Sequence, residues 1–458
     1  MDTISKYVVL LFLVCCFGLC ACSKGVAPKY EIITIQGVSW ACNVNSSYAI
    51  FGSLAESELE PEVTLPVSDG DLLYMVGGND QEFYYRYSRR DGMNLVVRFD
   101  TLNANTACLN GQLKSVELSD NQDSWELIKQ LTDPQRKQLS TLHITGSLSD
   151  HSLSLLQQHE SSLQGTGLLL EGECNLKLLG ELLSICRPGW LMLEGPLNLP
   201  DPENCMALSH IELLWIEEES HQDPALFSHC TNLESLIISG WKPGEGELLS
   251  LSGSGSLHTL TLAECGINDF SSIEFPTSLR RLHFIACDTL TDIRDIHKLK
   301  RLKGLSFSGS PHIQEILQLN ALTRIKWLGF PENVSQSEFA SLLGSLSKLE
   351  AIELLGCQKI ENISPLLNLN KLKILLVDLP IEKLADLGGL KDLNLLILAS
   401  DHFEENPNWI GQIKTSLPSA VVVPGSGLCL GSGWILLLLP LVLLSRLLIP
   451  NRRSQPLN

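Results

Sequence analysis

The sequence predicts an α/β repeat solenoid, in which a curved parallel sheet lines one side and helical or irregular segments line the other. A small N-terminal β domain precedes the solenoid, and an apolar C-terminal transmembrane helix follows it. Three observations predict this: one apolar pattern recurs through two thirds of the chain, the residues before it alternate as short strands, and both ends are apolar. Repetition at a fixed period is typical of solenoids, whose units bury their apolar faces by stacking.

Residues 1–22 have the composition of a signal peptide. Lys6 precedes an apolar stretch from Tyr7 to Leu19, and small residues follow. The stretch is shorter than the ~20 residues that a transmembrane helix needs, so cleavage and export are expected. The end of the segment also resembles a bacterial lipobox, which would make Cys22 a lipidation site. Both endings remain open.

Residues 23–112 predict a β-rich N-terminal domain or cap for the repeat array. Segments such as YEIITIQGV and EFYYRYS alternate as strands do, and Ser68-Asp69-Gly70 is a turn signal between two of them. Cys42 and Cys108 flank the region and are the candidate disulfide. Because the region contains no repeats, an enzyme or receptor activity of this domain is retained as an alternative.

The recurring pattern is L-x-x-L-x-L, with aliphatic or Phe substitutes. It reads LKSVEL from Leu113, recurs from Ile211 at intervals of about 21 to 24 residues, and ends with LNLLIL from Leu393. Residues 113–420 therefore resemble a leucine-rich-repeat array with internalin-like or Cys-containing repeats. The usual Asn after the strand is mostly replaced by Gly, Ala or Cys, as in LAEC and LLGC. We expect these cysteines to be small buried core residues.

The third and fifth residues of each pattern are expected on the concave face, which the resemblance implies is the binding surface. Four candidate binding residues follow, Trp215, Arg281, His283 and Trp327, since Trp and Arg are frequent in binding hot spots. The apolar residues from Ile374 to Ile397 would form an exposed patch if nothing covered them. Such a patch would mark a partner site or a dimer face.

Residues 421–427 are expected to link the array to an apolar helix over 428–450, and a basic tail occupies 451–458. The helix is long enough to cross a bilayer once, and Arg452 and Arg453 favour a cytoplasmic tail. A glycosylphosphatidylinositol signal and a bacterial sorting signal remain alternatives. All of these interpretations predict a cell-surface protein with its body outside the cytoplasm.

The sequence shows no motif for catalysis, and no CxxC pair occurs among the cysteines from Cys42 to Cys357. We therefore expect no enzyme activity, metal or cofactor. The 33 basic and 52 acidic residues give a net charge of −19, which disfavours nucleic acid as a partner. Asn45, Asn333 and Asn362 lie in glycosylation sequons.

Together these features predict a membrane-anchored extracellular protein that binds a protein or glycan partner through its concave sheet, in adhesion or recognition. The main alternative is a structural envelope protein that self-assembles as a homo-oligomer through its C-terminal repeats.

Overall fold

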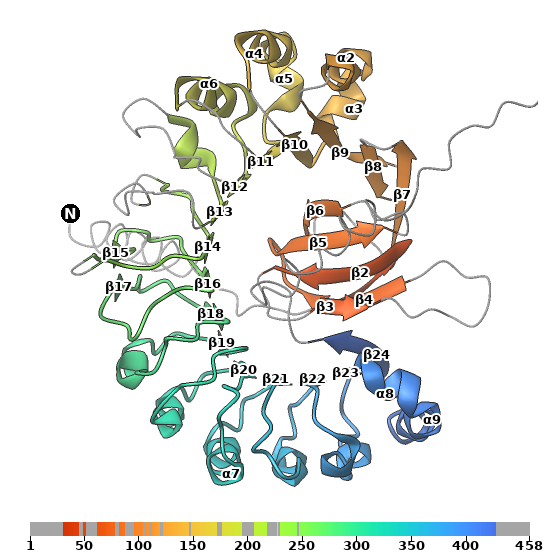
Figure 1. The fold of residues 1–458 in the computed structure, drawn as a ribbon, viewed down its shortest axis with the longest axis vertical. Coiled ribbons are helices and arrows are strands. Elements are labelled where there is room, and N and C mark those ends of the chain that lie inside the picture. The colour runs from red at the N-terminus through yellow and green to blue at the C-terminus, as the bar shows by residue number, and fades with distance from the viewer. Residues whose placement is uncertain are drawn as a thin grey trace, which may run out of the picture.

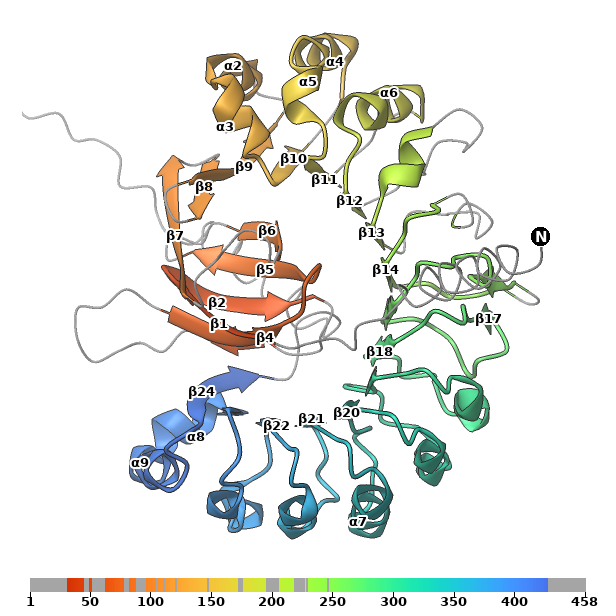
Figure 2. The ribbon, with the colours of Figure 1, turned by 180° about the vertical axis from the view of Figure 1, so that it is seen from behind.

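A computed structural model describes residues 31–44, 49–51, 62–77, 82–87, 96–103, 106–109, 112–119, 122–145, 148–171, 176–194, 206–217, 227, 230–244 and 247–426. The repeats curve into a horseshoe with the parallel sheet on its inner side. The N-terminal strands lie inside the horseshoe and between its two ends (Figures 1 and 2).

The N-terminal β domain is built from two small groups of strands. They are β1 (Glu31–Gln36), β2 (Val38–Asn43), β3 (Ala49–Phe51), β4 (Glu62–Val67), β5 (Leu72–Gly77), β6 (Glu82–Arg86), β7 (Val96–Asn103) and β8 (Thr106–Leu109). β1 pairs antiparallel with β4 and parallel with β7, while β5 lies antiparallel between β2 and β6. The expected turn joins β4 to β5, and Gly70 adopts φ +87°, which only glycine adopts at little cost.

The repeats form one continuous parallel sheet. Its strands are β9 (Gln112–Leu118), β10 (Thr141–Thr145), β11 (Gly167–Glu171), β12 (Trp190–Glu194), β13 (Leu213–Ile216), β14 (Ser235–Ser239), β16 (Thr259–Ala263), β18 (Arg281–Ile285), β19 (Gly304–Ser306), β20 (Trp327–Gly329), β21 (Ala351–Leu354), β22 (Ile374–Val377), β23 (Leu395–Ala399) and β24 (Val421–Ser426). Each strand pairs with the next in parallel. The array is a leucine-rich-repeat solenoid, as the repeats predict.

The convex side carries α-helices at both ends of the array, and mainly 3-10 helices together with α7 between them. Its α-helices are α2 (Gln122–Gln130), α3 (Asp133–Lys137), α4 (Asp150–Gln157), α5 (Glu160–Leu163), α6 (Leu176–Cys186), α7 (Gln336–Ser345), α8 (Ser400–Glu405) and α9 (Pro407–Ser416). Its 3-10 helices are η3 (Met206–His210), η5 (Arg294–Lys298), η6 (Ile316–Ala321), η7 (Ser364–Asn368), η8 (Ile381–Lys383) and η9 (Leu387–Gly389). Between these, β15 (Leu249–Ser250) and β17 (Ile273–Glu274) form a small separate ladder.

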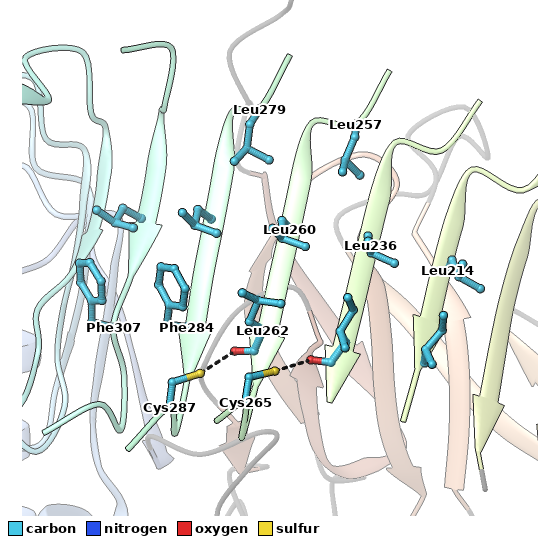
Figure 3. Packing of buried hydrophobic residues seen from close by; sticks show 14 of the residues in the cluster. Leu214, Leu236, Leu257, Leu260, Leu262, Cys265, Leu279, Phe284, Cys287 and Phe307 are labelled. Carbon is cyan, nitrogen blue, oxygen red and sulfur yellow. Dashed lines mark hydrogen bonds between the residues drawn. The ribbon is translucent and has the colours of Figure 1, made fainter. Parts of the chain in front are cut away.

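The solenoid core consists of equivalent side chains stacked from repeat to repeat. Phe284 and Phe307 stack with ring centroids 5.5 Å apart, and the neighbouring leucines are aligned in the same way (Figure 3). Cys265 donates to the carbonyl of Ile238 at 3.5 Å, and Cys287 donates to that of Leu262 at 3.3 Å (Figure 3). The repeat cysteines are therefore buried core residues, as expected, and each bonds the strand before it.

Both ends of the parallel sheet continue into the β domain. β9 pairs antiparallel with β8, and β24 pairs antiparallel with β3. Residues 421–426, which we expected to be a linker, instead form β24, because the β-branched Val421–Val423 extend the sheet and Val422 is buried. This pairing caps both sheet edges, which are otherwise templates for aggregation.

Within the described residues, no helix is long and apolar enough to cross a membrane. The predicted signal segment 1–22, the apolar helix 428–450 and the basic tail 451–458 lie outside the described residues.

Candidate functional site

The four candidate binding residues do not line an open surface. Trp215, Trp327 and His283 are only 1%, 2% and 3% exposed, and the side chain of Arg281 is 13% exposed. The expectation that they are exposed on the concave face is wrong, because the β domain lies against that face (Figure 1). A role of these residues in binding an external partner would require the β domain to move away.

Trp215 lies in an apolar cluster shared by the two parts of the chain. Cys42 and Leu72 from the β domain are buried with Trp215 and Ile237 from the repeats. The ring of Tyr84 meets the Trp215 ring edge-on, with centroids 6.0 Å apart. The indole Nε1 of Trp215 donates to Ser239 Oγ at 3.1 Å. The Trp215 side chain therefore fills a core.

A second shared cluster surrounds Trp327 and the C-terminal repeats. The residues of the expected apolar patch are buried there with side chains of β1, β4, β5 and β6; they are Ile374, Leu376, Leu395 and Ile397. The patch is therefore covered and is not an exposed dimer face. Trp327 Nε1 donates to the buried carboxylate of Glu353, which also accepts from Ser306 Oγ at 2.8 Å and Ser308 Oγ at 3.0 Å. These hydrogen bonds, which all come from residues of the repeats, offset the free-energy cost of burying the carboxylate.

Within the described residues, two ion pairs join the repeat sheet to the β domain. Arg281 Nη1 lies 2.8 Å from Asp71 Oδ1, and Asp71 Oδ2 accepts from Asn43 Nδ2 and the Ser68 amide, both at 2.7 Å. Arg86 Nη1 lies 2.7 Å from Glu212 Oε2. Arg281 is therefore a structural residue that pairs with the turn between β4 and β5.

His283 is a buried neutral imidazole. Among the described residues, neither ring nitrogen has a hydrogen-bond partner, and the neighbouring Thr261 hydroxyl on β16 has none either. Burial, and next the positive charge of Arg281, lower the pKa of His283 to about 3. At neutral pH this residue therefore contributes no charge to the concave sheet.

The predicted disulfide between Cys42 and Cys108 is wrong. Cys42 is disulfide-bonded, but Cys108 keeps its thiol. The two residues are buried in different clusters, Cys42 with Trp215 and Cys108 with the solenoid core. Their separation along the sequence gave no information on this geometry.

The predicted modification sites are Cys22, Asn45, Asn333 and Asn362. Cys22 and Asn45 lie outside the described residues. The Asn333 amide donates to the Ile313 carbonyl at 2.7 Å, which engages the nitrogen that a glycan would need. Asn362 Oδ1 accepts from the Ser364 amide at 3.2 Å within its own turn. Glycosylation of Asn362 stays a prediction.

Basic charge gathers where the strands of the middle repeats begin, in a set that we name the basic rim. Residues directly before strands β18, β19, β20 and β22 are basic; they are Arg280, Lys303, Lys326 and Lys373. Basic residues also lie two positions before Lys303, Lys326, Glu350 and Lys373; they are Arg301, Arg324, Lys348 and Lys371. Parallel strands place all these positions along one rim, and the Lys303 amide donates to the Arg280 carbonyl at 2.6 Å and the Lys326 amide to that of Lys303 at 2.8 Å.

The basic rim carries little compensating negative charge. Lys326 pairs with Glu350 at 2.6 Å, and no other ion pair of a rim cation is seen within the described ranges. Burial lowers the pKa of Lys303, and the charges of Arg324, Lys326, Lys348 and Arg280 lower it further. The rim cations are therefore close enough to repel one another. Sequence reasoning missed this set.

The opposite rim, where the strands end, carries acidic side chains. Asp378 accepts from the Gly356 amide at 2.9 Å, and burial raises its pKa. The pKa of Glu332 is raised by burial and then by the charges of Asp378 and Asp288. Within the described residues, no group of three or more His, Cys, Asp or Glu could hold a metal ion.

No family model matches the chain, and no curated protein matches it. Among solved structures, an internalin (inlF) from Listeria monocytogenes is 20% identical, covering 67% of this chain and 91% of that chain, with a TM-score of 0.39. A TLR13–ssRNA13 complex is 16% identical, covering 63% of this chain and 50% of that chain, with a TM-score of 0.36. A leucine-rich-repeat protein from Leptospira interrogans is 17% identical, covering 64% and 92%, with a TM-score of 0.29. The parallel register of consecutive strands in this chain defines its leucine-rich-repeat fold.

Proposed function

We propose that the protein is an extracellular, membrane-anchored recognition protein that binds a protein or glycan through its exposed rims. The horseshoe and the β domain together form a closed ring, because β9 pairs with β8 and β24 pairs with β3. The observation that carries this proposal is the burial of the concave sheet. Trp215 and Trp327 belong to apolar cores shared with the β domain, so an incoming partner meets the rims first. The ring then acts as a rigid scaffold for the charged side chains at the strand ends.

Display outside the cell is supported by the two apolar ends of the sequence, residues 1–22 and 428–450. Protease treatment of intact cells that express the full chain tests it. We expect cleavage of the ring without permeabilisation, and protection of an epitope tag placed after Asn458. Protection of the ring until the cells are permeabilised would contradict the proposed topology.

Binding fits the described polar groups better than catalysis does. The buried carboxylates inside the ring are engaged by internal donors, Asp71 by Asn43 and Arg281, and Glu353 by Trp327. A general base must reach a substrate proton, and these groups are instead held by the protein. Self-association through the C-terminal repeats loses its main support because Ile374 and Ile397 are covered.

A covalent lock of the ring tests which surface binds. Ala49 on β3 lies opposite Ser426 on β24, and Cα atoms in antiparallel pairs are ~4.5–5.5 Å apart, within disulfide range. The full chain carrying A49C and S426C is applied in lipid nanodiscs to arrays of immobilised glycans and secreted proteins. The wild-type chain and the single variant A49C, each with and without reductant, are the controls.

We expect the wild-type chain to retain at least one array component, and the oxidised double variant to retain it equally well. Loss of that binding on oxidation, with recovery on reduction of the double variant alone, would show that the concave sheet must open. A wild-type chain that retains nothing would contradict the recognition function.

A further inference from the structure

The basic rim departs from an ordinary solvated surface in the way its charges are arranged. Earlier on the same rim, the residues before β13 and β14 are Glu212 and Glu234. From β18 to β22 the equivalent positions are basic apart from Glu350. A typical soluble surface mixes both signs, whereas here they are separated along one row in a chain with net charge −19.

The spacing of the rim cations suits an extended ligand. Neighbouring strands lie ~4.8 Å apart, so the cations of β18 to β22 form a row in steps of about 5 Å. Arg301, Arg324, Lys348 and Lys371 are exposed. The ladder from Arg280 to Lys373 is fixed by backbone hydrogen bonds, such as the Lys373 amide to the Glu350 carbonyl at 2.8 Å. A row with fixed spacing attracts a linear anion with little ordering of the protein.

Nucleic acid is disfavoured by the surroundings of the rim. Proteins that bind single strands offer aromatic side chains on which bases stack. Every Phe and Trp side chain from Arg280 to Lys373 is buried, at 2% exposure or less; they are Phe284, Phe307, Trp327, Phe330 and Phe339. The rim therefore offers charge and hydrogen-bond donors but no stacking surface.

We propose that the basic rim binds a linear sulfated polysaccharide, whose anionic groups lie along the row of Arg and Lys side chains from Arg280 to Lys373. This inference rests on the proposed recognition function and names its partner class. Sulfate esters stay charged at all physiological pH values, and the guanidinium groups of Arg301 and Arg324 suit their oxygens.

Heparin is the probe, as a fluorescent fragment titrated with the full chain in nanodiscs of neutral phosphatidylcholine. The test variant is R301Q/R324Q/K348Q, which replaces three exposed side chains of the basic rim. The matched control is K137Q/K177Q/K359Q, which removes the same charge from exposed residues away from the rim. Circular dichroism and the urea midpoint confirm that both variants are folded.

We expect the test variant to weaken heparin binding roughly ten-fold at 0.15 M salt, and to flatten the slope of log affinity against log salt. The control should change the affinity by less than about three-fold. Equal losses in the two variants, or a wild-type chain that does not bind heparin, would overturn the proposal. Equally tight binding of single-stranded RNA or of phosphatidylserine vesicles through the same residues would overturn it as well.

The two experiments distinguish a failure of the recognition function from a failure of the polysaccharide assignment. If the chain retains an array component whose binding R301Q/R324Q/K348Q leaves unchanged, and heparin does not bind, then the recognition function stands and the polysaccharide assignment is wrong.

Discussion

Arg281 and Asp71, which are 210 positions apart in the chain, form an ion pair between the repeat sheet and the β domain. Asp71 is 1% exposed and also holds the turn between β4 and β5 through Asn43 and Ser68. One carboxylate therefore fixes both the local turn and the position of that turn on the concave sheet. The β domain and the array are joined through buried charge as well as apolar packing.

Replacing Asp71 with alanine should destabilise the whole ring. The substitution leaves the Arg281 guanidinium largely buried without its carboxylate, and removes an acceptor from Asn43, so we expect a loss of roughly 3–5 kcal/mol in unfolding free energy. Urea denaturation followed by tryptophan fluorescence measures this loss. Asp69, which is exposed in the same turn, provides the control D69A. Similar urea midpoints for D71A and D69A would show that the ion pair between Arg281 and Asp71 contributes nothing to the unfolding free energy.

Trp215→Ala and Trp327→Ala should each behave as a core truncation. Removal of a buried tryptophan costs about 3–5 kcal/mol, and both rings are almost fully buried. The half-buried Trp241 gives a comparison variant, W241A, with a smaller expected loss. A W215A variant that kept wild-type stability but lost partner binding would contradict this prediction, because it would show that Trp215 is an exposed binding residue.

His283 should make the protein sensitive to acid. Its pKa is lowered from 6.5 to about 3 in the folded state, so below about pH 6.5 the unfolded chain binds a proton that the folded chain does not. Stability then falls as the pH drops from 6.5 towards 3. We expect H283L to gain stability relative to wild type between pH 7 and pH 4.5, measured by urea midpoints. The exposed His297 gives the control H297L, and a pH-independent difference for H283L would contradict the assignment.

Cys186 should be an unreactive thiol at ordinary pH. Burial raises its pKa from 9.0 to about 12, and the thiolate is the reactive form. We expect iodoacetamide at pH 8.5 to modify Cys186 only after denaturation, as read by peptide mass spectrometry. The stabilisation that the protonated thiol contributes is present below pH 9 and lost as the pH rises towards 12. Rapid labelling of Cys186 in the native chain would contradict its burial.

The repeat fold was predictable because its core pattern is local. Residues two apart in a strand face the same way, so Leu260 and Leu262 predict an inward pair without knowledge of the rest of the chain. The cover on the other face was not predicted, because it depends on a contact between distant segments. The apolar character of Ile374, Leu376 and Ile397 was itself a sign that another segment covers this face, since exposed patches of this kind are costly.

The basic rim was missed because total charge averages over the whole surface. The signal was a pair of basic residues flanking the first apolar position of consecutive repeats, as in Arg301 and Lys303, or Arg324 and Lys326. The position of Cys108 had no comparable signal, because its surroundings are set by the pairing of β8 with β7 and with β9.

Hydroxyl-radical footprinting of the full chain tests the central claim, that the β domain covers the concave sheet. The half-buried Trp241 and Trp409 serve as internal references in the same sample. We predict that both references are oxidised readily, whereas Trp215 and Trp327 stay protected until the chain unfolds. Oxidation of Trp215 and Trp327 at the rate of the references in the native protein would contradict the account, because it would show an open concave face.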